Sequence, residues 1–295
     1  MATLTAPVRR STTITGIERD TRTKQVLYVF GGLLALLVFT VPLLWALFRS
    51  LQPGAVIVDP PDPATYFDVT LSNFTVLVQE GTLGRSIGNS LIVSLCSALL
   101  TAVLALFAGY GFAKFRFRGA NLLFAIIVLT MMVPFQAILT PLYLQLNAMR
   151  LTDSLFGLIL FYATVHLPFG VFVMRNSFTA IPAELEDSGH VDGAGTMRTL
   201  VSVLWPLVMP GAATTALYAF LASWTEFLGA LTFLTDPTLY TLPIDLVNLQ
   251  RGTYGQIDYG VLAAGAVVAM IPCVVLYIAL QRYYVRGLTS GAVKG

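Results

Sequence analysis

The segment IGNSLIVSLCSALLTAVLALFAGYGF, residues 87–112, contains no charged side chain and is long enough to cross a lipid bilayer. A hydrocarbon core about 30 Å thick needs roughly 20 apolar residues in a helix that rises about 1.5 Å per residue. Further apolar runs of this kind occur near residues 26–48, 120–143, 155–174, 205–230 and 260–281. The sequence therefore predicts an all-α, polytopic membrane protein with six transmembrane helices.

The composition of the 295-residue chain agrees with a lipid environment. Hydrophobic residues make up 56% of the chain and charged residues only 11%, with a mean hydropathy of +0.78. A soluble globular protein carries about 25% charged residues. This composition excludes a solvated α/β enzyme, a disordered chain and a nucleic-acid-binding domain, which would need a dense basic face. Cys96 and Cys273 both lie in apolar runs and imply no disulfide framework.

The basic residues predict the orientation of the six spans. If the N-terminus is inside, only Arg49, Arg85, Arg150 and Arg251 of the 17 basic residues lie outside. The positive-inside rule favours this orientation over its reverse. Thirteen basic against six acidic residues give +7 inside, and four against eight give −4 outside, with Glu226 left in or near a span. Both termini are therefore expected in the cytoplasm.

The same pattern divides the chain into segments. The run at 26–48 is longer than the apolar stretch of a signal peptide, which is about 7–15 residues, so we expect it to be retained as a helix. The expected segments are a cytoplasmic tail (1–24), the first transmembrane helix (25–49), an extracytoplasmic loop (50–86), a five-helix core (87–285) with a cytoplasmic loop at 175–204, and a cytoplasmic C-terminal tail (286–295).

The chain lacks the motifs of the common catalytic sites. A phosphate-binding loop ends in Gly-Lys-Ser or Gly-Lys-Thr, and none of Lys24, Lys114 and Lys294 stands in that context. The two histidines, His166 and His190, lie in different segments and do not form the pair of a zinc protease. For His166 we expect a packing role, with a hydrogen bond to a backbone carbonyl freed by Pro168.

The cytoplasmic loop contains the segment IPAELEDSGHVDGAGTMR, residues 181–198. Pro182 suits the first turn of a helix, and the acids Glu184, Glu186 and Asp187 favour its positive N-terminal end. The glycines that follow stop or bend the helix. The segment therefore predicts a short acidic surface helix, which is either a solvated connector or a part that docks into a basic cleft of a partner.

This loop resembles the EAA loop of ABC importer permeases, whose pattern is Glu-Ala-Ala, three residues, Gly, nine residues, Ile, one residue, Leu-Pro. Asp187-Ser188-Gly189 stands at Glu-Ala-Ala, Gly193 at the glycine, Val203 at Ile and Trp205-Pro206 at Leu-Pro. The spacing fits throughout, while Asp187, Ser188, Gly189 and Trp205 depart from the pattern. Six further segments resemble the second permease subunit of the maltose-type importers, at 89–93, 110–119, 132–136, 167–169, 224–228 and 281–295.

The resemblance, which covers roughly residues 67–295, implies a type I ABC importer permease core in the bacterial cytoplasmic membrane. The implied partners are a homologous permease subunit, two ATP-binding subunits, an extracytoplasmic sugar-binding protein (free or a lipoprotein) and membrane lipid, without nucleic acid. This chain would bind no cofactor, because ATP and Mg²⁺ belong to the ATPase. The implied ATPase-coupling residues are Glu184, Glu186, Asp187, Gly193 and Pro206, and the implied tail contacts are Gly291, Lys294 and Gly295.

The same resemblance, with the chemistry of sugar binding, suggests Gln136, Tyr218, Trp224 and Glu226 as residues of a translocation path. Glu226 has a second interpretation as an interfacial residue paired with water or a backbone donor. Thr225 stands where the family has Asn, so the resemblance does not carry over a particular sugar. Two other functions remain open at this point: a secondary transporter or channel that acts alone, and an intramembrane enzyme.

Overall fold

The computed structural model describes residues 15–52, 68–79, 83–191, 194–250 and 258–292, and every regular element in these ranges is helical. In chain order the elements are α1 (Thr15–Ser50), α2 (Ser72–Gln79), α3 (Leu83–Lys114), α4 (Ala120–Thr130), α5 (Phe135–Ala148), α6 (Leu155–Thr179), α7 (Ala183–Val191), α8 (Thr196–Thr199), the π-helix η1 (Leu200–Leu204), α9 (Trp205–Thr225), α10 (Leu228–Phe233), the 3₁₀-helix η2 (Pro237–Leu239), α11 (Leu242–Gln250) and α12 (Tyr259–Ala292).

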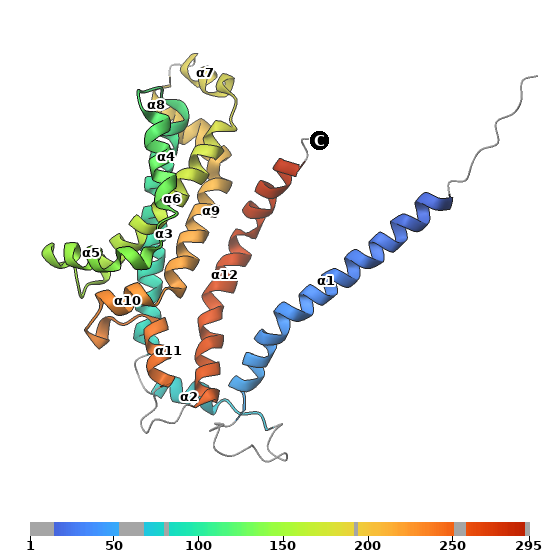
Figure 1. The fold of residues 1–295 in the computed structure, drawn as a ribbon, viewed down its shortest axis with the longest axis vertical. Coiled ribbons are helices and arrows are strands. Elements are labelled where there is room, and N and C mark those ends of the chain that lie inside the picture. Colours follow the sequence, from blue (N-terminus) through green and yellow to red (C-terminus); the bar gives the residue numbers. More distant parts are fainter. Residues whose placement is uncertain (1–14, 53–67, 80–82, 192–193, 251–257, 293–295) are drawn as a thin grey trace, which may run out of the picture.

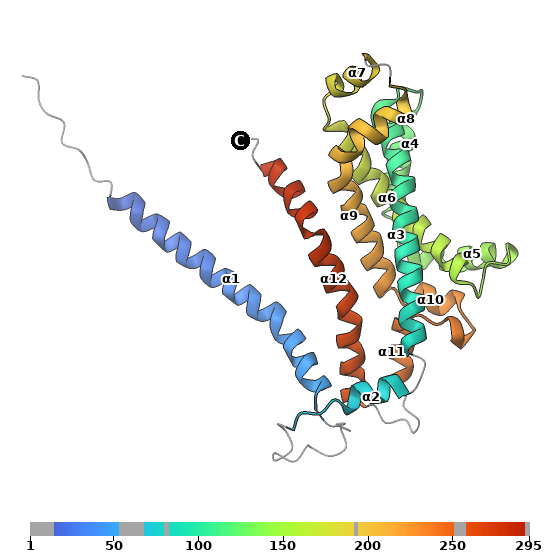
Figure 2. The ribbon, with the colours of Figure 1, turned by 180° about the vertical axis from the view of Figure 1, so that it is seen from behind.

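The helices form an elongated bundle (Figure 1). Helices α3, α6 and α9 lie at its centre, α12 packs along α9, and α1 leans away from the others, as the view from behind also shows (Figure 2). The most apolar stretch of α1 has no buried residue. Five of the described helices are long and apolar enough to cross a membrane, and a sixth span results if α4 and α5 count together. The chain is thus a multi-pass membrane protein.

Small residues let the three central helices approach closely. A Cβ atom built on Gly170 of α6 would lie 2.8 Å from both Ala105 Cβ of α3 and Thr215 Cγ2 of α9. In addition, the Ser97 hydroxyl of α3 donates to Ser223 Oγ of α9 over 3.0 Å. Small side chains and hydroxyl bonds hold helices together in lipid, where apolar burial between helices contributes little. The centre of the bundle is therefore closely packed.

The third predicted span, residues 120–143, is wrong as a straight helix. It is two helices, α4 and α5, with a bend of 100° between them. Pro134 lies at the break, and proline both lacks an N–H and disfavours helical geometry at the residue before it, here Val133. Helix α5 consequently projects sideways from the bundle (Figures 1 and 2).

The fifth predicted span, residues 205–230, is wrong at both ends. The helical path begins earlier, at Thr196, and passes through the π-helix η1 directly before Trp205-Pro206. A proline ring clashes with the carbonyl four residues earlier in a regular α-helix, and the wider π-turn relieves this crowding. At its other end α9 stops at Thr225, because Glu226 is extended and the chain turns into α10.

The end of the bundle that carries η2 and α11 is fastened by side chains of α3. Asn89 Nδ2 donates to the carbonyl oxygens of Thr238 and Tyr240, both over 3.0 Å, and Ser90 Oγ accepts from the Leu242 N–H over 2.8 Å. The segment expected as an extracytoplasmic loop, 50–86, includes the helix α2, and the chain after α10 includes the helix α11.

Asp153 connects the start of α6 to the same end of the bundle. Its Oδ1 accepts from the backbone N–H groups of Thr235 and Asp236, each over 2.9 Å. These two donors, first that of Asp236, hold the pKa of the Asp153 carboxyl below its usual value. The carboxylate therefore favours the ordered connection between α6 and the chain after α10.

Candidate functional site

Helix α7 caps one end of the bundle, opposite α2 and α11 (Figure 1). Glu184 and Asp187 on this helix are exposed and make no hydrogen bond or ion pair with another described residue. Two unpaired carboxylates on a protruding helix can meet a basic surface of another protein without first giving up partners of their own.

Glu186, on the same helix, is differently placed. Its Oε2 lies 3.2 Å from Lys114 Nζ, and its Oε1 accepts from the Tyr110 hydroxyl over 3.0 Å. Lys114 Nζ also donates to the Ile181 carbonyl, just before α7 begins, over 3.2 Å. The predicted coupling residue Glu186 thus has partners inside its own chain, in the last turns of α3.

The other side of α7 rests on the segment that leads into α9. Gly189 is buried, and a Cβ atom there would lie 3.3 Å from Thr199 Oγ1 and 3.8 Å from Val203 Cγ2. Pro206 is exposed in the first turn of α9, whereas Gly193 lies outside the described residues. The helix is consequently held from two sides while its acidic tip stays open.

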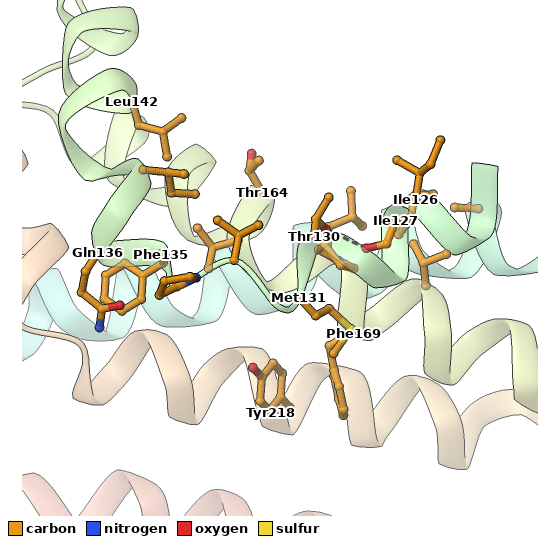
Figure 3. Close-up of a pocket in the computed structure, with 18 residues that line it drawn as sticks. Ile126, Ile127, Thr130, Met131, Phe135, Gln136, Leu142, Thr164, Phe169 and Tyr218 are labelled. Carbon is orange, nitrogen blue, oxygen red and sulfur yellow. Dashed lines mark hydrogen bonds between the residues drawn. The ribbon is translucent and has the colours of Figure 1, made fainter. Parts of the chain in front are cut away.

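A cavity of about 690 Å³ lies beside the break between α4 and α5 (Figure 3). Two of the predicted path residues border it, Gln136 from α5 and Tyr218 from α9, and the hydroxyls of Thr130 and Thr164 add two more polar groups. The remaining walls are mostly apolar. A mainly apolar hollow with a few hydrogen-bonding groups and an aromatic ring can hold a polar organic solute such as a sugar.

The other two predicted path residues do not line this cavity. Trp224 is buried, and its indole N–H donates to the Ala269 carbonyl of α12 over 3.0 Å. Glu226 Oε2 accepts from the Tyr162 hydroxyl over 2.7 Å and from the N–H groups of Gly229 and Ala230 over 2.8 and 3.3 Å. Trp224 thus joins α9 to α12, and Glu226 caps α10.

His166 is buried between two aromatic rings. It stacks on Tyr162 and meets Tyr218 edge to face, with ring centroids 6.2 and 5.6 Å away. Its Nε2 has no hydrogen-bond partner in the described part of the chain, so the expected bond to a carbonyl freed by Pro168 is not formed there. No described serine pairs with it, and the described ranges contain no group of three or more metal-ligating side chains.

The sequence profile of the family described as "Binding-protein-dependent transport system inner membrane component" matches residues 101–290. The chain belongs to this family. It is therefore a permease subunit of a binding-protein-dependent importer and a multi-pass protein of the cytoplasmic membrane, and this decides between the importer and the stand-alone transporter or enzyme that the sequence left open.

Named relatives support the permease assignment. The trehalose transport system permease protein SugB of Mycobacterium tuberculosis is 33% identical over 86% of this chain and 92% of its own length. The arabinooligosaccharides transport system permease protein AraQ of Halalkalibacterium halodurans is also 33% identical, over 79% and 82%. A solved bacterial ABC transporter involved in the import of the acidic polysaccharide alginate matches the fold with a TM-score of 0.76 at 22% identity, covering 90% of this chain and 98% of its own.

Three permease residues escaped the sequence prediction: Tyr110 and Lys114, which hold Glu186, and Tyr162, which holds Glu226. A lone lysine at the end of an apolar run was a visible signal for Lys114, but its partner lies in another segment. Of the predicted tail contacts, Gly291 lies near the end of α12, and Lys294 and Gly295 lie outside the described residues.

Proposed function

We propose that this permease imports a sugar and couples to separate ATP-hydrolysing subunits through α7. The observation that carries the proposal is the acidic tip of α7, where Glu184 and Asp187 stand exposed at one end of the bundle. The chain has no phosphate-binding loop, so the energy of ATP must come from a partner. A basic cleft on that partner would complement the two carboxylates.

The distribution of charge supports an orientation with α7 in the cytoplasm, where ATP is found. With α7 inside, thirteen of the 17 basic residues face the cytoplasm, as the positive-inside rule demands. The η2–α11 end then faces outward, toward a binding protein that delivers the sugar. Nucleotide-driven closure of two ATPase subunits, with their ATP and Mg²⁺, would move α7 and tilt the bundle as a rigid body.

The cavity beside α5 supports the second half of the proposal. Its Tyr218 ring and the polar ends of Gln136 and Thr164 suit the apolar faces and hydroxyls of a sugar. The named relatives transport trehalose and arabinooligosaccharides, which supports a sugar as the cargo. Because one chain lines only one side, a homologous permease would close the path from the other.

Charge reversal at the tip of α7 tests the coupling. We expect Glu184→Lys combined with Asp187→Lys to remove the ATPase subunits from the purified complex and to abolish uptake, with an unchanged amount of the chain in the membrane. Asp68→Lys is the matched control, because it reverses an exposed charge away from the α7 end of the bundle. This variant should retain both the ATPase subunits in the complex and the uptake. Full uptake with the double reversal would refute docking through α7.

The cargo is tested on the solute-binding protein that delivers it to this permease. Thermal shift with a panel of mono-, di- and oligosaccharides should reveal a ligand among the sugars. A binding protein that responds to none of them but does respond to amino acids or peptides would overturn the sugar assignment.

A further inference from the structure

The contacts of Glu186 separate it from the other acids of α7. Side-chain exposure is 16% for Glu186 and 12% for its partner Lys114, so the ion pair is largely shielded from water. Glu184 and Asp187, one on each side in the sequence, are exposed. Shielded ion pairs are screened little by salt, and removal of one partner leaves the other charge without compensation. One short helix thus presents acids for two different purposes.

Lys114 fastens α7 at two points. Its ammonium group meets Glu186 in the first turns of α7 and also donates to the Ile181 carbonyl at the junction with α6. The Tyr110 hydroxyl, one turn earlier in α3, donates to the second oxygen of the same carboxylate. Both carboxylate oxygens and the entry to α7 are therefore held by the last turns of α3.

The last turns of α3 are in turn packed firmly on α6. The Tyr110 side chain is 5% exposed, and its ring lies 5.3 Å from that of Phe178. One residue before it, a Cβ on Gly109 would lie 2.5 Å from Met174 Cβ and 2.8 Å from the backbone nitrogen of Arg175. Such close contact leaves no room for α3 and α6 to slide independently at this level. A displacement that reaches α3 is accordingly passed to α6.

We propose that Glu186 is a positioning residue for transport, which ties α7 to α3 through Lys114 and Tyr110 so that α7, α3 and α6 move as one body. The inference rests on the proposed coupling role of α7. It gives Glu186 a task distinct from docking: Glu184 and Asp187 engage the ATPase, and Glu186 passes the movement into the transmembrane helices. Without this tie, α7 would follow the ATPase while α3 stays behind.

Electron spin resonance tests the tie directly. Spin labels replace Ala183, exposed at the start of α7, and Leu104, exposed on α3, in a chain with Cys96→Ser and Cys273→Ser. The complete transporter is measured in nanodiscs with and without ATP. We expect one narrow distance distribution that ATP leaves in place. In Lys114→Gln we expect loss of that narrow distribution and an ATP-dependent shift, while the ATPase subunits still co-purify.

Four further variants separate loss of the tie from simple damage to the fold. The charge swap Lys114→Glu with Glu186→Lys and the conservative Lys114→Arg should both restore the narrow distribution. Tyr110→Phe, which keeps the ring and removes one bond, should broaden it less than Lys114→Gln. Arg118→Gln, the loss of an exposed charge in the connection between α3 and α4, is the matched control and should change nothing.

The outcomes separate the tie from the coupling role. A distribution in Lys114→Gln identical to that of the parent chain overturns the proposal, as does a failure of both rescue variants. The ATP-dependent shift is read in the complete transporter, whereas the width of the distribution without ATP needs no ATPase. That width still tests the tie if no ATPase co-purifies with the parent, a result that would refute the docking of α7 instead.

Discussion

The acid at the end of α9 gives the sharpest test of what the structure adds to the sequence. Glu226 was expected either in the translocation path or as a paired interfacial residue, and it accepts three hydrogen bonds within the chain. We predict that Glu226→Ala destabilises the protein whether or not a substrate is present, because the Tyr162 hydroxyl, on a residue only 1% exposed, loses its partner.

The size of the effect follows from these bonds. Loss of a helix-capping side chain costs about 0.5–2 kcal/mol. A buried hydroxyl left without a partner costs about 1–3 kcal/mol, although single hydrogen bonds in membrane proteins average only about 0.6 kcal/mol. We therefore expect Glu226→Ala to lower the free energy of unfolding by about 2–4 kcal/mol. Glu226→Gln keeps an acceptor oxygen and should lose only about 1 kcal/mol.

The assay is unfolding by sodium dodecyl sulfate in mixed micelles, followed by tryptophan fluorescence, since Trp224 lies buried two residues away. Asp258→Ala is the matched control. Asp258 also accepts two backbone bonds at a helix start, from Gly260 and Val261, but has no tyrosine partner among the residues that the structure describes, so its loss should cost about 1 kcal/mol. If Glu226→Ala unfolds like the parent protein yet abolishes uptake, the capping role is wrong and Glu226 belongs to the translocation path.

Three further predictions concern packing, the η2–α11 end and pH. Gly170→Val should lower the free energy of unfolding by about 1–3 kcal/mol in the same assay, because even a Cβ would press on Ala105 and Thr215. Gly88→Val, where a Cβ meets nothing within 4 Å, is the control. Equal losses of stability in the two variants would contradict the close crossing of α3, α6 and α9. Asn89→Asp removes the donor to the Thr238 and Tyr240 carbonyls, so amide hydrogen exchange at residues 238–242 should accelerate. Unchanged exchange would show that Asn89 does not hold this segment in place. The folded pKa of Asp153 lies below the ordinary value of 3.8, so the ionised carboxylate stabilises the fold above pH 3.8 and this contribution is lost as the pH falls through the folded pKa. Between neutral pH and about pH 3 the melting temperature should therefore fall further in the parent than in Asp153→Asn. Equal falls would contradict the role of this carboxylate.

The membrane class and the helical fold could be predicted from the sequence because lipid imposes a local requirement on each span. Every backbone polar group in a bilayer must be satisfied internally, so about 20 apolar residues in a row already indicate a helix. The break at Pro134 shows the limit of this logic. Prolines are tolerated in membrane helices, so the residue alone did not reveal that α4 and α5 bend by 100°.

The site was predictable only where its chemistry is local. The acids of α7 and its short helical form lie in one segment, and the exposure of Glu184 and Asp187 agrees with a polar loop between two spans. The partners of Glu186 and Glu226 lie far away in the chain: Tyr110 is 76 residues from Glu186, and Tyr162 is 64 residues from Glu226. Such pairs arise from the tertiary packing of α3 and α6, which a single sequence does not display.

Photocrosslinking measures the proposed contact between α7 and an ATP-hydrolysing subunit directly. A photoreactive phenylalanine derivative replaces Ala183, next to the exposed Glu184, in cells that carry the whole transport system. We predict a covalent adduct between this chain and the ATPase subunit, and none from the same group at Asp68, which is also exposed. An adduct with lipid or the companion permease alone, with no ATPase captured from position 183, would contradict the account.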